Sequence, residues 1–313
     1  MTTPSLRVAD PSIPDPWPAL WESFDLDMRF QRRSDQTRAA YAEASKQFHA
    51  YLLDHKLPTD PAELKREHVR NFIAHLAERG ASPATCRSRF SALRAFFGFL
   101  VREEEIEASP MTGMTAPKVD EQAPEVLTED ELRALLKACE GSEFEDYRDR
   151  ALIRLMLDAG LRRGEAAGLL VEDLDLPNGT VLVLPKGRQQ KEPRFFGVNT
   201  ARELDRYQRR ARARHRLAGL PNLWLAQKGP LQGDGVHHAI QRRARLAGIE
   251  RRVWPHLLRH TFGHMLKSAG ASDEVTMTAG GWRDSKSMRR YGASARVSRA
   301  QAAYRELSPG DRL

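Results

Sequence analysis

Apolar side chains recur at helical spacing in the first third of the chain. Three stretches carry this pattern, and they span residues 41–52, 60–79 and 82–100. The second and third begin with a polar residue followed by proline, and the second ends before a glycine, which are typical signals of helix starts and stops. The pattern predicts an all-helical domain over residues 17–108, preceded by a flexible N-terminus over residues 1–16.

A different pattern follows a proline-containing stretch. Residues 109–126 hold three prolines and no helical apolar spacing, so we expect an interdomain linker there. From residue 127 helical spacing returns, with a capping-box pattern at Thr128 and Glu131. Over residues 174–198 the apolar positions alternate instead, and Asn178-Gly179 is a tight-turn signal.

The predicted fold class is therefore mainly α with a small antiparallel β-sheet. We expect two domains, a helical one and then a mixed α/β one over residues 127–313. At the end of the chain, apolar positions between residues 297 and 307 recur at helical spacing and predict a C-terminal helix.

Charge adds a candidate partner to this picture. The chain has 50 basic and 42 acidic residues, a net charge of +8, and 40 of the basic residues are arginine. Two stretches, residues 81–102 and 186–216, are strongly basic. Arginine offers phosphate a planar two-pronged donor, so we expect a polyanion between the two domains. The residues predicted to bind it are Arg87, Arg89, Arg94, Arg188 and Lys191.

Other features narrow the classes of protein. Two cysteines, Cys86 and Cys139, cannot form a disulfide framework, and no signal peptide or apolar run of membrane-spanning length is visible. We therefore expect a cytoplasmic protein without a membrane partner. No phosphate-binding glycine-rich loop and no cluster with metal-ligand spacing is present, so we expect neither a nucleotide nor a metal cofactor.

Four short motifs carry candidate chemistry. In order they are AGLRRGE with Arg162 and Glu165, LPKGRQQKEP with Lys186, WPHLLRHTF with His256, Arg259 and His260, and GGWRDSKSMRRYG with Trp282 and Tyr291. Taken singly, each residue has an ordinary structural explanation. The two histidines have the spacing of a zinc-protease helix, but that motif needs glutamate where this chain has Leu257.

Together and in this order, the motifs resemble those of the tyrosine recombinase (phage integrase) family. The family's Arg-Lys-His-Arg-His/Trp-Tyr set maps onto Arg162, Lys186, His256, Arg259, Trp282 and Tyr291. The stretch SPATCRSRFSALRAFFGFLVREEEIEASPMTGM is similar to the end of the family's helical, SAM-like core-binding domain, and APEVLTEDELRALL to the entry of its catalytic domain. The resemblance runs from about residue 17 to the C-terminus.

The resemblance implies a reaction and a role for each side chain. Tyr291 is the nucleophile that forms a 3′-phosphotyrosyl bond with DNA, and Lys186 is the general acid for the departing 5′-oxygen. Arg162 and Arg259 clamp the phosphate oxygens, and His256 binds an oxygen and helps accept the tyrosine proton. Trp282 donates a bond and packs the site. Glu165 and His260 support these residues.

The family also implies the partners. They are double-stranded DNA with specific core sites and further copies of the chain, which form a tetramer on two duplexes and pass through a Holliday junction. Neither metal nor ATP is needed. The C-terminal helix is expected to dock into a neighbouring subunit.

This chain departs from the family pattern at three places. Leu257 stands where aspartate is frequent, Trp282 stands where histidine is commoner, and the hairpin turn is slightly long. The long turn leaves two candidates for the general acid, and we favour Lys186 over Lys191 because it directly follows the strand. Two other functions stay open: a type IB topoisomerase-like relaxing enzyme, and a non-catalytic DNA-binding protein of the same fold.

Overall fold

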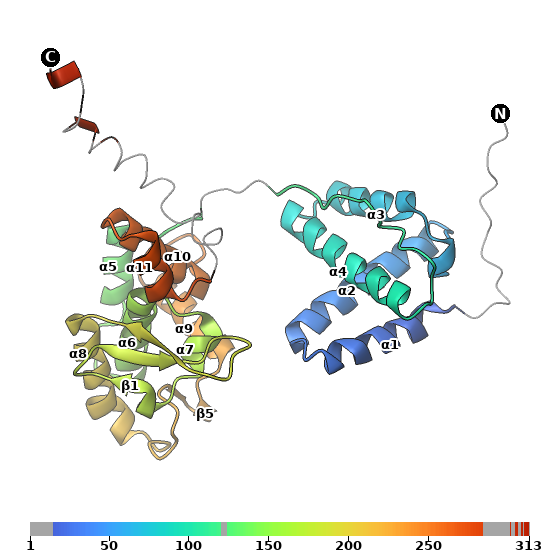
Figure 1. The fold of residues 1–313 in the computed structure, drawn as a ribbon. Helices are drawn as coiled ribbons and strands as arrows, with labels where there is room; N and C mark the ends of the chain where they lie inside the picture. Colours follow the sequence, from blue (N-terminus) through green and yellow to red (C-terminus); the bar gives the residue numbers. More distant parts are fainter. Residues whose placement is uncertain are drawn as a thin grey trace, which may run out of the picture. The chain divides into compact units, whose positions relative to one another are not determined.

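The computed structural model describes residues 15–119 and 124–283, together with residues 301, 304, 305, 308 and 310–312 near the C-terminus. The chain forms two compact units that divide after Asp120. Both are drawn in Figure 1, and each is described by itself.

The first unit is all helical. Its elements are α1 (Trp17–Phe30), α2 (Asp35–Asp54), a short 3-10 helix (Pro61–Glu63), α3 (Arg66–Glu78) and α4 (Pro83–Arg102). Serine caps start two of them, because Ser34 accepts from the Thr37 amide and Ser82 from the Thr85 amide. The helix α4 packs against α1, α2 and α3, and its phenylalanines are central to the core of this unit.

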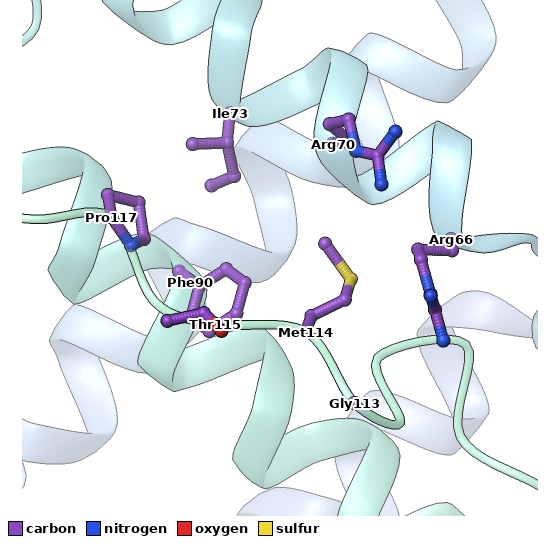
Figure 2. A pocket seen from close by; sticks show the side chains of 8 residues that line it. All are labelled: Arg66, Arg70, Ile73, Phe90, Gly113, Met114, Thr115 and Pro117. Atoms are coloured by element: carbon purple, nitrogen blue, oxygen red, sulfur yellow. The ribbon is translucent and has the colours of Figure 1, made fainter.

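Residues 111–117, which follow α4, lie along this unit, and we call them the strap. Met111 is buried in the helical core, and Met114 packs against it. Arg66 of α3 donates to the Thr112 carbonyl at 2.6 Å, and Arg94 of α4 donates to the Met114 carbonyl. Figure 2 shows Met114 pointing from the strap into a cavity of about 270 Å³ that is lined by Arg66, Arg70 and Phe90. Part of the predicted linker is therefore ordered, because its methionines and carbonyls find partners on α3 and α4.

The second unit begins with helices and then forms its sheet. The elements are α5 (Glu129–Lys137), α6 (Phe144–Ala159), α7 (Arg163–Ala167), a 3-10 turn (Val171–Asp173), β1 (Leu174–Asp175), β2 (Thr180–Val183) and β3 (Glu192–Phe195). The three strands are antiparallel in the order β1-β2-β3, with Leu174 opposite Val181 and Val181 opposite Arg194. The predicted turn lies between β1 and β2, but it spans four residues, Leu176 to Gly179, and is closed by the Gly179 amide donating to the Leu176 carbonyl at 3.3 Å. Gly179 has a positive φ of 62°, which favours glycine there.

Helices dominate the rest of the unit. They are α8 (Val198–Arg206), which continues as a π-helical and a 3-10 turn (Tyr207–Ala211 and Arg212–Arg214), α9 (Gly233–Leu246), α10 (Pro255–Ser268) and α11 (Asp273–Gly280). A two-stranded antiparallel sheet, β4 (Leu225–Ala226) and β5 (Gly229–Pro230), precedes α9. The predicted fold class, mainly α with a small antiparallel sheet, is confirmed.

The helix α6 runs through the core of this unit and contacts α5, α8, α9, α10 and β3. A buried carboxylate fixes α9 to it. Asp149 is fully buried and accepts from Arg148 at 2.8 Å, from Arg242 at 2.7 Å and from Arg243 at 2.8 Å. Burial alone would raise the pKa of Asp149, but the charge of Arg148 and the hydrogen bonds from α9 outweigh it and hold the pKa below 3.8. A charged Asp149 therefore sets where α9 lies on α6.

None of the helices that the structure describes is both long and apolar enough to cross a lipid bilayer.

Candidate active site

The site begins where α6 ends. Gly160 caps α6 in the left-handed conformation, with φ of 59°, and the chain then turns into α7. Arg162 is the residue before α7, and its side chain is 37% exposed. Glu165 is buried, and its two carboxylate oxygens accept from the Arg162 amide at 2.9 Å and from Nη1 of its guanidinium at 2.7 Å. Glu165 therefore holds Arg162 in place and leaves part of the guanidinium open to a ligand.

The second arginine reaches the same corner from α10. Arg259 is 3% exposed, and its Nη1 donates to the carbonyl oxygen of Gly160. A Cβ atom on Gly160 would lie 2.3 Å from the Phe262 ring, so only glycine lets α10 approach this closely. Because Gly160 stands two positions before Arg162, this contact brings the two arginines together from segments about 100 residues apart in the sequence.

An aromatic stack supports the buried arginine. The Arg259 guanidinium carbon lies 4.1 Å from the centroid of the Trp282 ring, a cation–π distance. Trp282 is 7% exposed and stacks on Phe262, with ring centroids 5.9 Å apart and planes at 14°. The indole therefore packs between Phe262 and the guanidinium of Arg259.

His256 lies in the first turn of α10, which starts at Pro255. It keeps an exposed edge, and its ring centroid is 6.3 Å from that of His260 one turn later. Its pKa is lowered from 6.5, first by desolvation and then by the positive charges of Arg259 and Arg162, with Glu165 opposing the shift. At neutral pH His256 is therefore uncharged, with one ring nitrogen free to accept a proton.

The two candidate lysines lie on the hairpin between β2 and β3. Lys186 is exposed on the turn that follows β2. Lys191 is bonded through Nζ to the carboxylate of Asp173, which is buried. Arg188 is also on this turn, and its Nη1 lies 3.6 Å from Oε1 of Glu192. The turn thus presents Lys186 to solvent, whereas Lys191 has a structural partner.

Arg194 joins this hairpin to the segment that carries Trp282, and the sequence did not single it out. It is 3% exposed on β3, and its guanidinium lies against Gly281, where a Cβ atom would be 1.9 Å from Nη2. Gly281 has φ of 61° and directly precedes Trp282. Arg194 lies directly opposite the buried Val181 in the sheet, and residues opposite each other share one face. The alternation of apolar positions along the strands is therefore the signal that could have predicted its burial.

Tyr291 lies outside the described residues, as does most of the predicted C-terminal helix. Among the predicted site residues that the structure does describe, it brings together Arg162, Glu165, His256, Arg259 and Trp282, with His260 beside them.

The three arginines predicted to bind DNA on α4 differ in their surroundings. Arg87 is exposed, and the structure gives its guanidinium no hydrogen bond or ion pair within residues 15–119. Arg89 donates to the Gln47 side chain at 2.8 Å and so joins α4 to α2. Arg94 donates to the strap at Met114 and lies 4.7 Å over the Phe90 ring. Two of the three arginines therefore have structural contacts.

Within the described residues, no group of three or more histidine, cysteine or acidic side chains is arranged to hold a metal ion.

The chain is similar in sequence to a known protein family and to proteins of known activity. The profile of the phage integrase family matches residues 125–297, and that of the phage integrase N-terminal SAM-like domain matches residues 20–107. Tyrosine recombinase XerD of Pseudomonas putida is 30% identical over 276 residues, which cover 87% of this chain and 91% of that protein.

Solved structures share the fold. The XerH site-specific recombinase in a post-cleavage complex with its difH substrate has a TM-score of 0.73 and 21% identity, over 91% of this chain and 83% of that one. A lambda integrase tetramer bound to a Holliday junction has a TM-score of 0.65 and 16% identity, over 85% and 77% of the two chains.

The surroundings of His256 generate a test of the site's electrostatics. Removing the positive charge in Arg162→Ala should raise the pKa of His256, and removing the negative charge in Glu165→Gln should lower it further. Arg133→Ala, a change at an exposed arginine of α5, should leave it unchanged. NMR titration of the imidazole, assigned by its loss in His256→Asn, measures all three. Equal pKa values in the wild type, Arg162→Ala and Glu165→Gln would contradict this account.

Proposed function

The chain belongs to the phage integrase family, and on that premise we propose that it is a tyrosine site-specific recombinase that breaks and rejoins double-stranded DNA. One observation supports the proposal most strongly: Arg162 and Arg259 meet at the end of α6, with His256 beside them. Two guanidinium groups and a neutral imidazole are a suitable set for one phosphodiester. Because DNA is the substrate, we place its action in the cytoplasm.

The arginines stabilise the reaction electrostatically. Attack on a phosphodiester places additional negative charge on its oxygens, and fixed cations that need no rearrangement lower the barrier. Arg259 is held by the Gly160 carbonyl and the Trp282 ring, and Arg162 by Glu165, so both are oriented before DNA arrives. By analogy with arginines in other phosphoryl transfers, each contributes roughly 10³–10⁵ in rate.

Proton transfers complete the exchange. We propose that Tyr291 attacks the phosphorus, forms the 3′-phosphotyrosyl ester and passes its proton toward His256, whose lowered pKa leaves it neutral and able to accept. The P–O bond to the 5′-oxygen breaks, and a lysine supplies the proton that makes it a free hydroxyl. One ester replaces another, so a second attack by a 5′-hydroxyl reverses the steps and reseals the DNA.

We propose Lys186 as that general acid. It is exposed on the turn after β2, whereas the ammonium of Lys191 is bonded to the Asp173 carboxylate. A lysine that already pairs with a buried carboxylate has to break that bond before it can reach DNA, and it would leave an uncompensated charge behind.

We also propose that four copies act on two duplexes with specific core sites and pass through a Holliday junction. The lambda integrase structure, a tetramer bound to such a junction, supports this by analogy. The helical unit, which matches the family's SAM-like domain, favours recombination over the relaxation of a single duplex.

Tyr291→Phe removes the attacking hydroxyl and keeps the ring. We expect it to abolish the covalent adduct on a nicked suicide duplex, seen as a shifted band on a denaturing gel, and to leave binding largely intact. The duplex comes from selection of a random pool by this same variant. Tyr304→Phe changes an exposed tyrosine near the C-terminus and should still form the adduct. An adduct that survives in Tyr291→Phe would refute the assignment.

A sulfur leaving group identifies the general acid. Lys186→Ala should slow cleavage of the normal duplex by about 10²–10⁴. Replacing the bridging 5′-oxygen by sulfur should restore most of the rate, because a thiol with a pKa near 8.5 leaves without being protonated. Lys191→Ala is the matched control and should show no such rescue. Rescue of Lys191→Ala alone would assign the role to Lys191 instead.

Two selected duplexes with different fluorophores test strand exchange. We expect joined products that carry both labels, and a four-way junction on native gels before them. A relaxing enzyme with the same chemistry would unwind supercoiled plasmid carrying the site but give no joined product, and that outcome would contradict the proposal.

A further inference from the structure

A cavity of about 400 Å³ opens beside His256. It is lined by Arg163, His237, Arg252, Trp254, Pro255 and His256. These residues come from the start of α7, the first half of α9, the segment before α10 and the first turn of α10. Only His256 is shared with the constellation proposed to bind the scissile phosphate, so the cavity is a neighbouring compartment rather than the same one.

The walls of this cavity are basic. Arg252 is exposed, and its guanidinium has no hydrogen bond or ion pair to any residue within 124–283. Arg163 pairs through Nη1 with Asp234 at 2.9 Å, but Asp234 is 82% exposed and engages one edge of the fork. The pKa of His237 is lowered, first by desolvation and then by the positive charges of Arg252, His238 and Arg163, with Asp234 opposing them. Positive charge therefore exceeds negative charge around the cavity.

Backbone geometry separates Arg163 from its neighbour Arg162. Arg162 bonds Glu165 within α7, whereas Arg163 lies over the first residue of α9, where a Cβ atom on Gly233 would be 3.4 Å from its Nε. Farther along α9, Arg242 and Arg243 bond to the buried Asp149 and attach this helix to α6. The tandem arginines thus serve two different places.

We propose that this cavity binds a second, non-scissile phosphate of the same DNA strand, held by Arg163, Arg252 and His237. The inference rests on the proposed function. Arginine forks and an imidazole N–H suit a phosphate, and Trp254 and Pro255 supply an apolar wall for the adjoining sugar. Because His256 borders both compartments, the bound phosphate lies next to the scissile one and sets the register of the strand.

Salt dependence provides the first test. We measure binding of a 30-base-pair random duplex by fluorescence anisotropy across salt concentrations. The slope of log K against log salt is negative, and losing one phosphate contact in Arg252→Ala should reduce its magnitude by about 0.9. Arg245→Ala, at an exposed arginine near the other end of α9, should keep the wild-type slope. An unchanged slope in Arg252→Ala, or an equal fall in Arg245→Ala, would overturn the proposal.

A chemical double-mutant cycle locates the phosphate. Neutral methylphosphonates replace single phosphates of the selected duplex, and we expect one position beside the scissile phosphate to weaken wild-type binding but not that of Arg252→Ala or His237→Asn. Coupling at the scissile phosphate itself, or at no position, would overturn the inference. Adduct formation by the wild type is scored separately, so the proposed function stands or fails on its own. Inorganic phosphate also competes with the duplex for binding. If it displaced DNA equally well from the wild type and from Arg252→Ala, the cavity would select no anion, and the inference would fail.

Discussion

The bond from Arg259 to the carbonyl oxygen of Gly160 is the interaction on which the rest of the site depends. It ties α10 to the end of α6, and α10 also carries His256. The left-handed Gly160 has no side chain to hold the Phe262 ring away, and the chain turns there into Arg162. A single backbone oxygen therefore gathers residues from two distant segments. The Trp282 stack and the Glu165 pair then fix the orientation of each guanidinium.

The same arrangement explains the acid–base behaviour of the site. Desolvation first, and then the charges of Arg259 and Arg162, lower the pKa of His256, so the imidazole is neutral at neutral pH. A bound phosphate would offset the repulsion between these cations, so the site we propose is electrostatically complementary to a phosphate. In our proposal, Arg163, Arg252 and His237 add positive charge beside His256, where a neighbouring phosphate of the strand would bind. The exposed Lys186 lies on a hairpin that Arg194 joins to the Trp282 segment.

Much of this could be predicted from the sequence, because local chemistry determines it. Ser82 and the Asn178-Gly179 signal act through neighbouring residues, so the start of α4 and the first hairpin follow from the sequence. The start of α2 at Asp35 lies before the predicted stretch over residues 41–52. The motif order identified the family, and the roles that it assigns to the site residues stay predictions. Partners distant in sequence could not be predicted: charge alone does not show that Arg89 meets Gln47, that Arg94 holds the strap, or that Arg194 is buried beside Gly281. Composition likewise predicted a linker over residues 109–126 and did not show that Met111 and Met114 pack against the helical unit.

The central claim is that Arg162, Arg259 and His256 surround one phosphorus atom. A crystal structure of the Tyr291→Phe variant on its selected duplex tests it most directly. The account predicts that guanidinium nitrogens of both arginines and a ring nitrogen of His256 lie within hydrogen-bond distance of the non-bridging oxygens of one phosphate, with the ring of residue 291 facing its phosphorus. A phosphate bound by only one arginine, or a ring at position 291 in another cavity of every protomer, would contradict it.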